Sequence, residues 1–170
     1  MKCMKAKALI KILILAAIIV AIGTVLYLKS AGTAELTLYN SRSMMDWKLG
    51  GEIAGVASEE DAMTYDTEHF EYFTDKNGSG IKSTSSNTRY YLGSYRDSYR
   101  VIGFSTTADY YSVMGIRIDD SELDAKTLLL NSGYSMNGGG LDYCRASDGR
   151  ITVYLDFEHG IVTGMAAFLK

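Results

Sequence analysis

The stretch DYCRASDGRITVYLDFEHGIVTGMAAFL, residues 142–169, decides the fold of this chain. Every second residue from Ile151 to Phe157 is apolar, which is the pattern of a strand that buries one of its two faces. Turn signals stand on both sides of this strand, at Asp148-Gly149 and His159-Gly160. The stretch therefore predicts three antiparallel strands in a meander, with a two-residue type I′ turn at Asp148-Gly149.

A helix is predicted before the meander, in residues 119–133. Asp119, Asp120 and Ser121 offer N-terminal caps, leucines supply an apolar side, and Gly133 stands where a helix ends. The glycines at 138–140 read as a flexible connector from helix to sheet. We expect an α+β fold with a two-layer helix-on-antiparallel-sheet domain, because a helix and a sheet bury their apolar faces against each other. The alternating residues 35–39 (ELTLY) predict a further strand.

Residues 12–28, ILILAAIIVAIGTVLYL, form an uncharged apolar run with four lysines before it and Lys29 after it. A bilayer core needs about 20 apolar residues, within a range of roughly 17–25, and lysine-rich flanks stay in the cytoplasm. The run therefore predicts an N-terminal transmembrane helix that acts as a signal anchor. Residues 1–29 would form the cytoplasmic start and the anchor, and residues 30–170 an extracytoplasmic domain. We expect a single-pass protein of the cell membrane with its C-terminal domain extracellular.

The apolar run has two alternative interpretations. A cleaved signal peptide has the same charged start, and cleavage near Ala34 would leave a secreted protein. A buried core helix is the other alternative, but such a helix seldom lacks a polar face over so long a run.

The charge of the chain is unevenly distributed. The formal net charge is −3, yet residues 1–29 hold five lysines and no acid, so residues 30–170 hold 12 basic and 20 acidic residues. An acidic domain disfavours nucleic acid and anionic lipid as partners. Arg89, Arg96 and Arg100 interleave with Asp97, which indicates a solvated strand face. The expected partners are the membrane, through the N-terminal helix, and an envelope protein or cell-wall component.

The sharpest candidate for a site is DKNGSG, residues 75–80. Asp75, Asn77 and Ser79 would supply oxygen ligands at positions one, three and five of a calcium loop, with a glycine at position six. Position twelve is Ser86 rather than the glutamate that completes such a loop. The alternative is a polar hairpin tip in which Asn-Gly supplies positive φ. No other cofactor is expected.

Six tyrosines recur between residues 90 and 111 and form a possible contact surface. Tyrosine gives a large contact area at low entropic cost, so an exposed row of tyrosines would suit a protein or a glycan. The alternative is that aromatic cross-strand pairs stabilise the sheet. The six residues are Tyr90, Tyr91, Tyr95, Tyr99, Tyr110 and Tyr111.

The sequence offers no catalytic signature. His69 and His159 are isolated, and carboxylate pairs such as Glu59-Glu60 are more typical of loops and caps. Cys144 is expected to be a buried thiol outside any disulfide. The pattern favours a membrane-anchored binding protein over an enzyme. A hydrolase built from scattered Asp, Ser and His, or a calcium-stiffened adhesive module, are the alternatives.

One part of the chain shows a recurring pattern of Gly115-Ile116, Asp120-Ser121, a leucine helix, Gly133-Tyr134 and two hairpins. Residues 115–169 thus resemble the helix-then-meander unit of small extracytoplasmic proteins built like the β-lactamase inhibitor protein and the SmpA/OmlA lipoproteins. A similar unit occurs in uncharacterised Gram-positive membrane-anchored proteins. The chain lacks the lipobox cysteine, and it lacks the proline that usually follows the helix in the lipoproteins. The resemblance implies protein or envelope binding rather than catalysis.

Overall fold

The computed structural model describes residues 2–170, with side chains for residues 14, 16–27 and 33–170. The chain divides into two compact units, Met1–Thr37 and Leu38–Lys170. A 41-residue helix, α1 (Lys2–Arg42), passes through this division. The strand predicted at 35–39 is wrong, because these residues belong to α1. Tyr39 is buried in the second unit.

The apolar run lies in the first part of α1. In the part of the chain that the structure describes, no helix combines the length and the apolar character that crossing a membrane requires. The predictions of an N-terminal transmembrane helix and of a membrane signal anchor are therefore wrong. The run comprises 17 residues, which an α-helix extends over about 26 Å. This is less than the thickness of a hydrocarbon core, about 30 Å.

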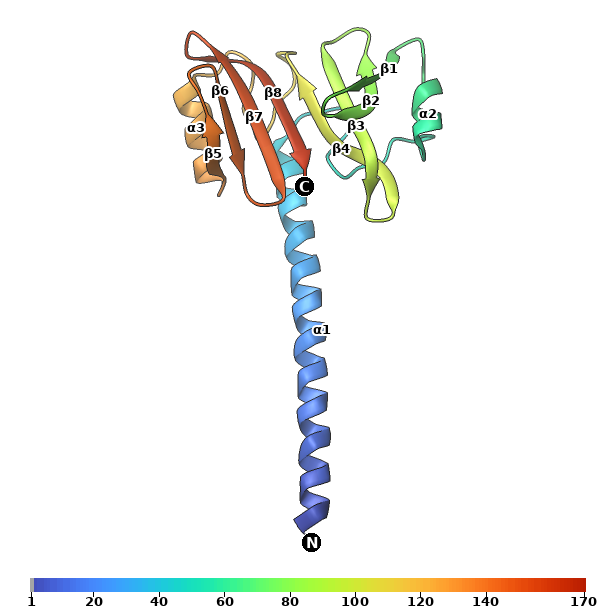
Figure 1. Ribbon diagram of the computed structural model, residues 1–170. Helices are drawn as coiled ribbons and strands as arrows, with labels where there is room; N and C mark the ends of the chain where they lie inside the picture. Colours follow the sequence, from blue (N-terminus) through green and yellow to red (C-terminus); the bar gives the residue numbers. More distant parts are fainter. Residues whose placement is uncertain (1) are drawn as a thin grey trace. The chain divides into compact units, whose positions relative to one another are not determined.

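Residues 38–170, all of which the structure describes, form an eight-stranded antiparallel sheet (Figure 1). The order across the sheet is β1-β2-β3-β4-β8-β7-β6-β5, so two four-stranded meanders meet where β4 pairs with β8. The strands are β1 (Phe70–Asp75), β2 (Gly78–Ser83), β3 (Thr88–Tyr95), β4 (Ser98–Thr106), β5 (Ser135–Gly139), β6 (Tyr143–Ser147), β7 (Ile151–Glu158) and β8 (Ile161–Leu169).

Two short helices accompany the sheet within residues 43–170. The six-residue α2 (Glu59–Thr64) contacts β1 and β2, and the ten-residue α3 (Glu122–Asn131) contacts β5 and β8. The predicted two-layer α+β domain is therefore wrong: the sheet dominates and few helices cover it. Outer strands such as β5 carry glycine and serine rather than alternating apolar residues. They form because a neighbouring strand pairs with their backbone, which local sequence does not reveal.

The helix and the meander near the C-terminus are confirmed as elements. Ser121 caps α3, and Gly133 follows its end with φ +86°. β6, β7 and β8 occupy the predicted stretch. The glycines at 138 and 139 belong to β5 rather than to a flexible connector. The first turn also differs, since Gly149 has positive φ but Asp148 does not, which excludes type I′.

The two meanders repeat one plan at an interval of 63 residues. SEEDAMT at 58–64 and SELDAKT at 121–127 share five of their seven residues, and each begins a helix. The Ser58 hydroxyl accepts a hydrogen bond from the Asp61 N–H (3.2 Å), as the Ser121 hydroxyl does from Asp124 (3.1 Å). β7 and β8 also begin and end 63 residues after β3 and β4. The helix and the two inner strands of each half therefore form an internal structural repeat.

The β4–β8 pairing, which joins the two halves, shows the same 63-residue interval. Phe104 of β4 pairs with Ala167 of β8, 63 residues later. Two residue pairs flank this central pair, and a shift of 63 residues between the halves converts one flanking pair into the other. A local pseudo-two-fold axis therefore passes through the central pair. These flanking pairs are Gly103 with Phe168 and Ser105 with Ala166.

One face of the sheet is covered and forms the core. Segments 38–57 and 107–120 cover this face, where the Tyr39 ring contacts that of Phe104 and the Trp47 ring meets that of Tyr90 edge to face. Neighbouring side chains along each strand point to opposite faces. The opposite face, here called the open face, carries residues such as Arg89, Ser105 and Tyr154. Buried side chains of the covered face include Ile81, Tyr90, Val101, Phe104, Val153, Leu155 and Ala167.

Candidate functional site

A groove lies on the open face where β4 and β8 meet. Its main part has a volume of about 470 Å³, and an adjoining part has about 210 Å³. Arg89, Ser105, Asp156 and Ala166 line both parts, so we treat them as one groove. The main part is lined by Lys76, Asn77, Arg89, Tyr91, Ser105, Tyr154, Asp156, Ala166 and Phe168.

Strand register explains why the groove forms at this place. Arg89, Ser105, Ala166 and Tyr154 lie opposite one another on the consecutive strands β3, β4, β8 and β7. The two central residues are small and the two outer residues are large. Strands lie about 4.8 Å apart, so the floor is two strands wide between larger side chains.

An aromatic ladder beside the floor holds the groove in shape. Phe73 meets Tyr91 edge to face with ring centroids 5.2 Å apart, and Tyr91 lies 4.9 Å from Phe168. Tyr154 meets Phe168 edge to face at 6.1 Å. Edge-to-face pairs stabilise by about 0.5–1.5 kcal/mol beyond their buried area. A Cβ atom on Gly103 would lie 2.2 Å from the Phe168 ring, so glycine at this position makes room for the ladder.

Two arginines occupy ring faces at the ends of the ladder. The Arg89 guanidinium lies 5.6 Å from the Phe73 ring centroid, and that of Arg145 lies 5.7 Å from the Tyr154 centroid. Such cation–π contacts favour a fixed orientation of the charged group. An arginine therefore covers a ring face at each end of the ladder.

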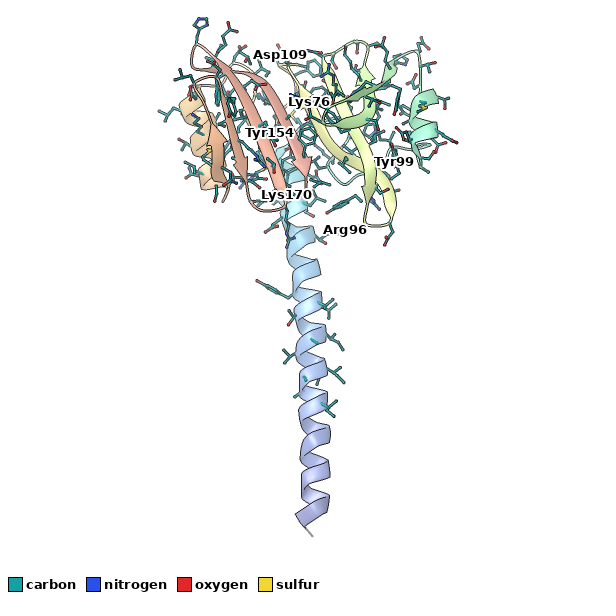
Figure 2. The ribbon with its side chains drawn as sticks, viewed as in Figure 1. Lys76, Arg96, Tyr99, Asp109, Tyr154 and Lys170 are labelled. Atoms are coloured by element: carbon teal, nitrogen blue, oxygen red, sulfur yellow. The ribbon has the colours of Figure 1, made fainter. Side chains whose placement is uncertain are left out.

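The polar groups that line the groove differ in whether they have hydrogen-bond or ion-pair partners. The Tyr91 hydroxyl donates to Asp75 (3.0 Å), which ties β3 to the β1–β2 turn. By contrast, four lining side chains form no hydrogen bond or ion pair within the part of the chain that the structure describes. These are Lys76, Ser105, Tyr154 and Asp156, of which Figure 2 labels Lys76 and Tyr154.

The residues of the predicted calcium loop lie at the tip of the β1–β2 hairpin. Asp75 pairs with Gly78 across a two-residue turn. The two carboxylate oxygens of Asp75 accept hydrogen bonds from the Asn77 N–H (2.8 Å) and the Tyr91 hydroxyl. Within the described residues, no group of three or more His, Cys, Asp or Glu is placed to hold a metal ion. Calcium binding stays a prediction.

The six tyrosines do not form one surface. Tyr90 and Tyr91 are both buried and, as neighbours on β3, point to opposite faces. Tyr90 and Tyr111 meet on the covered face, where both hydroxyls donate to the Asp46 carboxylate. Burial raises the pKa of both hydroxyls. Of the remaining three, Tyr110 is exposed, and Tyr95 and Tyr99 are half-buried near the β3–β4 turn.

The other candidate groups lie apart from the groove. His69 stands before β1 with its Nδ1 atom 2.9 Å from Asp66, and His159 lies in the β7–β8 turn. Cys144 is a free, buried cysteine, and burial raises the pKa of its thiol. A separate hollow of about 530 Å³ is lined by residues 52–57 and 97–99. We favour the open-face groove because it collects polar side chains that form no hydrogen bond or ion pair in the described part of the chain.

Sequence reasoning missed most of this groove. The interpretation of Arg89 as part of a solvated strand face overlooks its position above Phe73. Ser105, Asp156 and Phe168 carry no local signal. One signal is present in the sequence: the 63-residue repeat assigns Tyr91 and Tyr154 to equivalent positions, and both line the groove.

No protein-family model and no curated protein sequence matches the chain. Among solved structures, the chain is similar to an extracellular protein containing a SCP domain from Bacillus anthracis str. Ames, with 10% identity and a TM-score of 0.36. The match covers 71% of this chain and 48% of that protein, so it spans about half of the solved protein's length. A likeness of this size carries no argument about fold or function.

Proposed function

We propose that residues 38–170 form a protein-binding domain whose open-face groove receives a segment of a partner protein. The observation that carries this proposal is a set of polar side chains that form no hydrogen bond or ion pair within the described residues, around a small-residue floor: Lys76, Ser105, Tyr154 and Asp156. Groups that lack partners within the domain are available to pair with a bound segment. The small floor residues let the backbone of that segment approach the sheet.

The aromatic ladder supports the same function. Binding costs free energy when side chains must be ordered, and a preorganised surface reduces that cost. Tyr91 is 1% exposed and is held by ring contacts and by its hydrogen bond to Asp75. The walls of the groove are therefore ordered before any partner arrives.

The proposed place of action is outside the cytoplasm. Lysines followed by the apolar run at 12–28 form the pattern of an export signal. Cleavage near Ala34 would release the domain. N-terminal sequencing of the protein recovered from the medium and from the cell pellet tests this; an intact chain confined to the cytosol would contradict it.

A groove-filling variant tests the binding proposal. Ser105→Trp places a large side chain on the floor, whereas Ser94→Trp places it on an exposed position of the same sheet outside the groove. Tagged wild-type and variant chains are used to capture partners from an envelope extract, with quantitative mass spectrometry as the readout. We expect a partner captured by wild type and by Ser94→Trp to fall at least about tenfold with Ser105→Trp. Equal capture by both variants would refute the proposal.

A further inference from the structure

The polarity of the groove identifies the kind of segment that it takes, an inference that rests on the proposed function. We infer that the groove binds an extended peptide segment with an acidic side chain at one end and a basic side chain about four residues away. The acidic side chain would face Lys76 and Arg89, and the basic one would face Asp156.

The two sides of the groove carry opposite charge. Lys76 and Arg89 stand at the β1–β2 turn and on β3, and both line the main part. Asp75 offsets part of this positive charge, since the Arg89 guanidinium lies 3.9 Å from its carboxylate. Two positive charges and one negative charge leave this side net positive.

The opposite side is negative. Asp156 of β7 is exposed and lines both parts of the groove. A Cβ atom on Gly164 would lie 2.8 Å from an Asp156 carboxylate oxygen, so this side chain leans over β8 toward the groove. Arg145, on the neighbouring strand β6, is directed onto the Tyr154 ring. The Asp156 carboxylate forms no ion pair within the described residues.

Strand spacing sets the length of the segment. Arg89 and Asp156 lie on strands that are three spacings apart, β3 and β7, and Asp156 lies two residues beyond Tyr154, which is in register with Arg89. At about 4.8 Å per spacing, the width of the groove between these strands is about 14 Å. An extended peptide rises about 3.3 Å per residue, so acidic and basic side chains four residues apart match it. The Ser105 hydroxyl lies between the charged sides, the Tyr154 hydroxyl stands beside Asp156 on β7, and both are available to the main chain of the segment.

The ring contacts favour a peptide over a sugar. A sugar needs a free aromatic face, but Arg145 covers a face of Tyr154 and Tyr91 is almost completely buried. A peptide needs charged and hydrogen-bonding groups, which the lining offers. The opposite charges at the two ends also give the segment a direction.

Synthetic peptides of defined charge test this inference on the full chain. Three sets carry acid-x-x-x-base, acid-x-x-x-acid or base-x-x-x-base, with alanine, serine and tyrosine mixed at x, and binding is measured by fluorescence anisotropy. We expect wild type to prefer the acid–base set about tenfold. Asp156→Lys should shift the preference to the acid–acid set, and Lys76→Glu combined with Arg89→Glu should shift it to the base–base set. Asp148→Lys, outside the groove, should leave the order unchanged.

Two results would overturn the inference. One is equal binding of all three peptide sets to wild type, or an order that the variants do not change. The other is tighter binding of a chitin tetrasaccharide than of any peptide set. If partner capture still depends on Ser105 in these cases, the proposed function stands and the assigned peptide chemistry fails. If capture does not depend on Ser105, the proposed function fails as well.

Discussion

The β1–β4 half and the β5–β8 half of the sheet share a backbone plan but present different surfaces to the groove. Tyr91 and Tyr154 stand at equivalent positions and line opposite sides. Where the first half has Ser105, the second half has Phe168. Phe168 covers Gly103, whereas Ser105 is too small to cover Ala166. The groove beside the pseudo-two-fold axis is therefore filled on the side of Phe168 and open on the side of Ser105.

The charged side chains of the groove also differ between the two halves. Arg89 in the first half corresponds to Thr152 in the second, and Asp156 in the second corresponds to Gly93 in the first. A symmetric backbone thus carries an asymmetric set of side chains. The repeated backbone plan explains where the groove lies, and the side chains that differ between the halves explain its shape and polarity.

The pair on the axis should carry the largest effect, because it belongs to both halves. Phe104 is fully buried, and Phe104→Ala should lower the free energy of unfolding by about 3–5 kcal/mol through the cavity that it leaves. Urea denaturation followed by tyrosine fluorescence and by circular dichroism should show one shared transition. Tyr110→Ala, at a 54% exposed position, is the control and should change stability by less than about 0.5 kcal/mol. Separate unfolding of the two halves would contradict a common core.

The positions flanking the axis distinguish the halves directly. Gly103→Val should cost about 1–3 kcal/mol, because the new side chain would displace the Phe168 ring. The equivalent change Ala166→Val adds methyl groups to the open floor and should cost less than about 1 kcal/mol. Thermal unfolding of both variants measures the difference. Equal destabilisation would mean that the groove floor is as tightly packed as the ladder.

The two helix caps should behave alike. Ser58→Ala and Ser121→Ala each remove a side-chain acceptor for an N-terminal N–H group, which should cost about 1 kcal/mol. The double variant should show the sum within about 0.5 kcal/mol, because the caps share no partner. Urea midpoints of the three variants test this. A cap with no effect in one half would show that its helix adds little to the folded domain.

The smallest expected effect is a pH dependence of stability that differs between the two helix caps. Hydrogen bonds from the Ala57 N–H and from Ser58 hold the pKa of Asp61 below its usual value of 3.8. The stabilisation by this carboxylate is therefore complete above about pH 5 and declines as the pH falls below about 4. Asp61→Asn should be less stable than wild type at pH 7, and this gap should narrow at pH 3.

Asp124→Asn is the matched change in the second half. Asp124 accepts from the Ser121 hydroxyl (2.7 Å), and no bond like that from Ala57 accompanies it in the described part of the chain. The gap at pH 7 should therefore be larger for Asp61→Asn. Urea titrations at both pH values measure the two gaps, and a gap for Asp61→Asn that widens in acid would contradict the low pKa.

Local pattern predicted elements that carry either strict apolar alternation or clear end signals. β7 was predictable because apolar residues alternate from Ile151 to Phe157, and α3 because Ser121 and Gly133 mark its ends. The alternation at 35–39 misled, since Leu36 and Tyr39 also share a face of a helix. β5 was missed because its glycines have low strand propensity. Of the groove, only Tyr91 was among the predicted contact residues.

The sequence alone determined the Ser121 cap of α3 and the apolar alternation of β7, since each depends on residues close together in the chain. Tertiary structure alone decided the site. Ser105 and Ala166 become neighbours only when β4 pairs with β8, which are 54 or more residues apart in the chain. That register depends on long-range packing of the covered face, and a shift of one residue would turn the groove side chains inward. Local propensity does not encode this strand register.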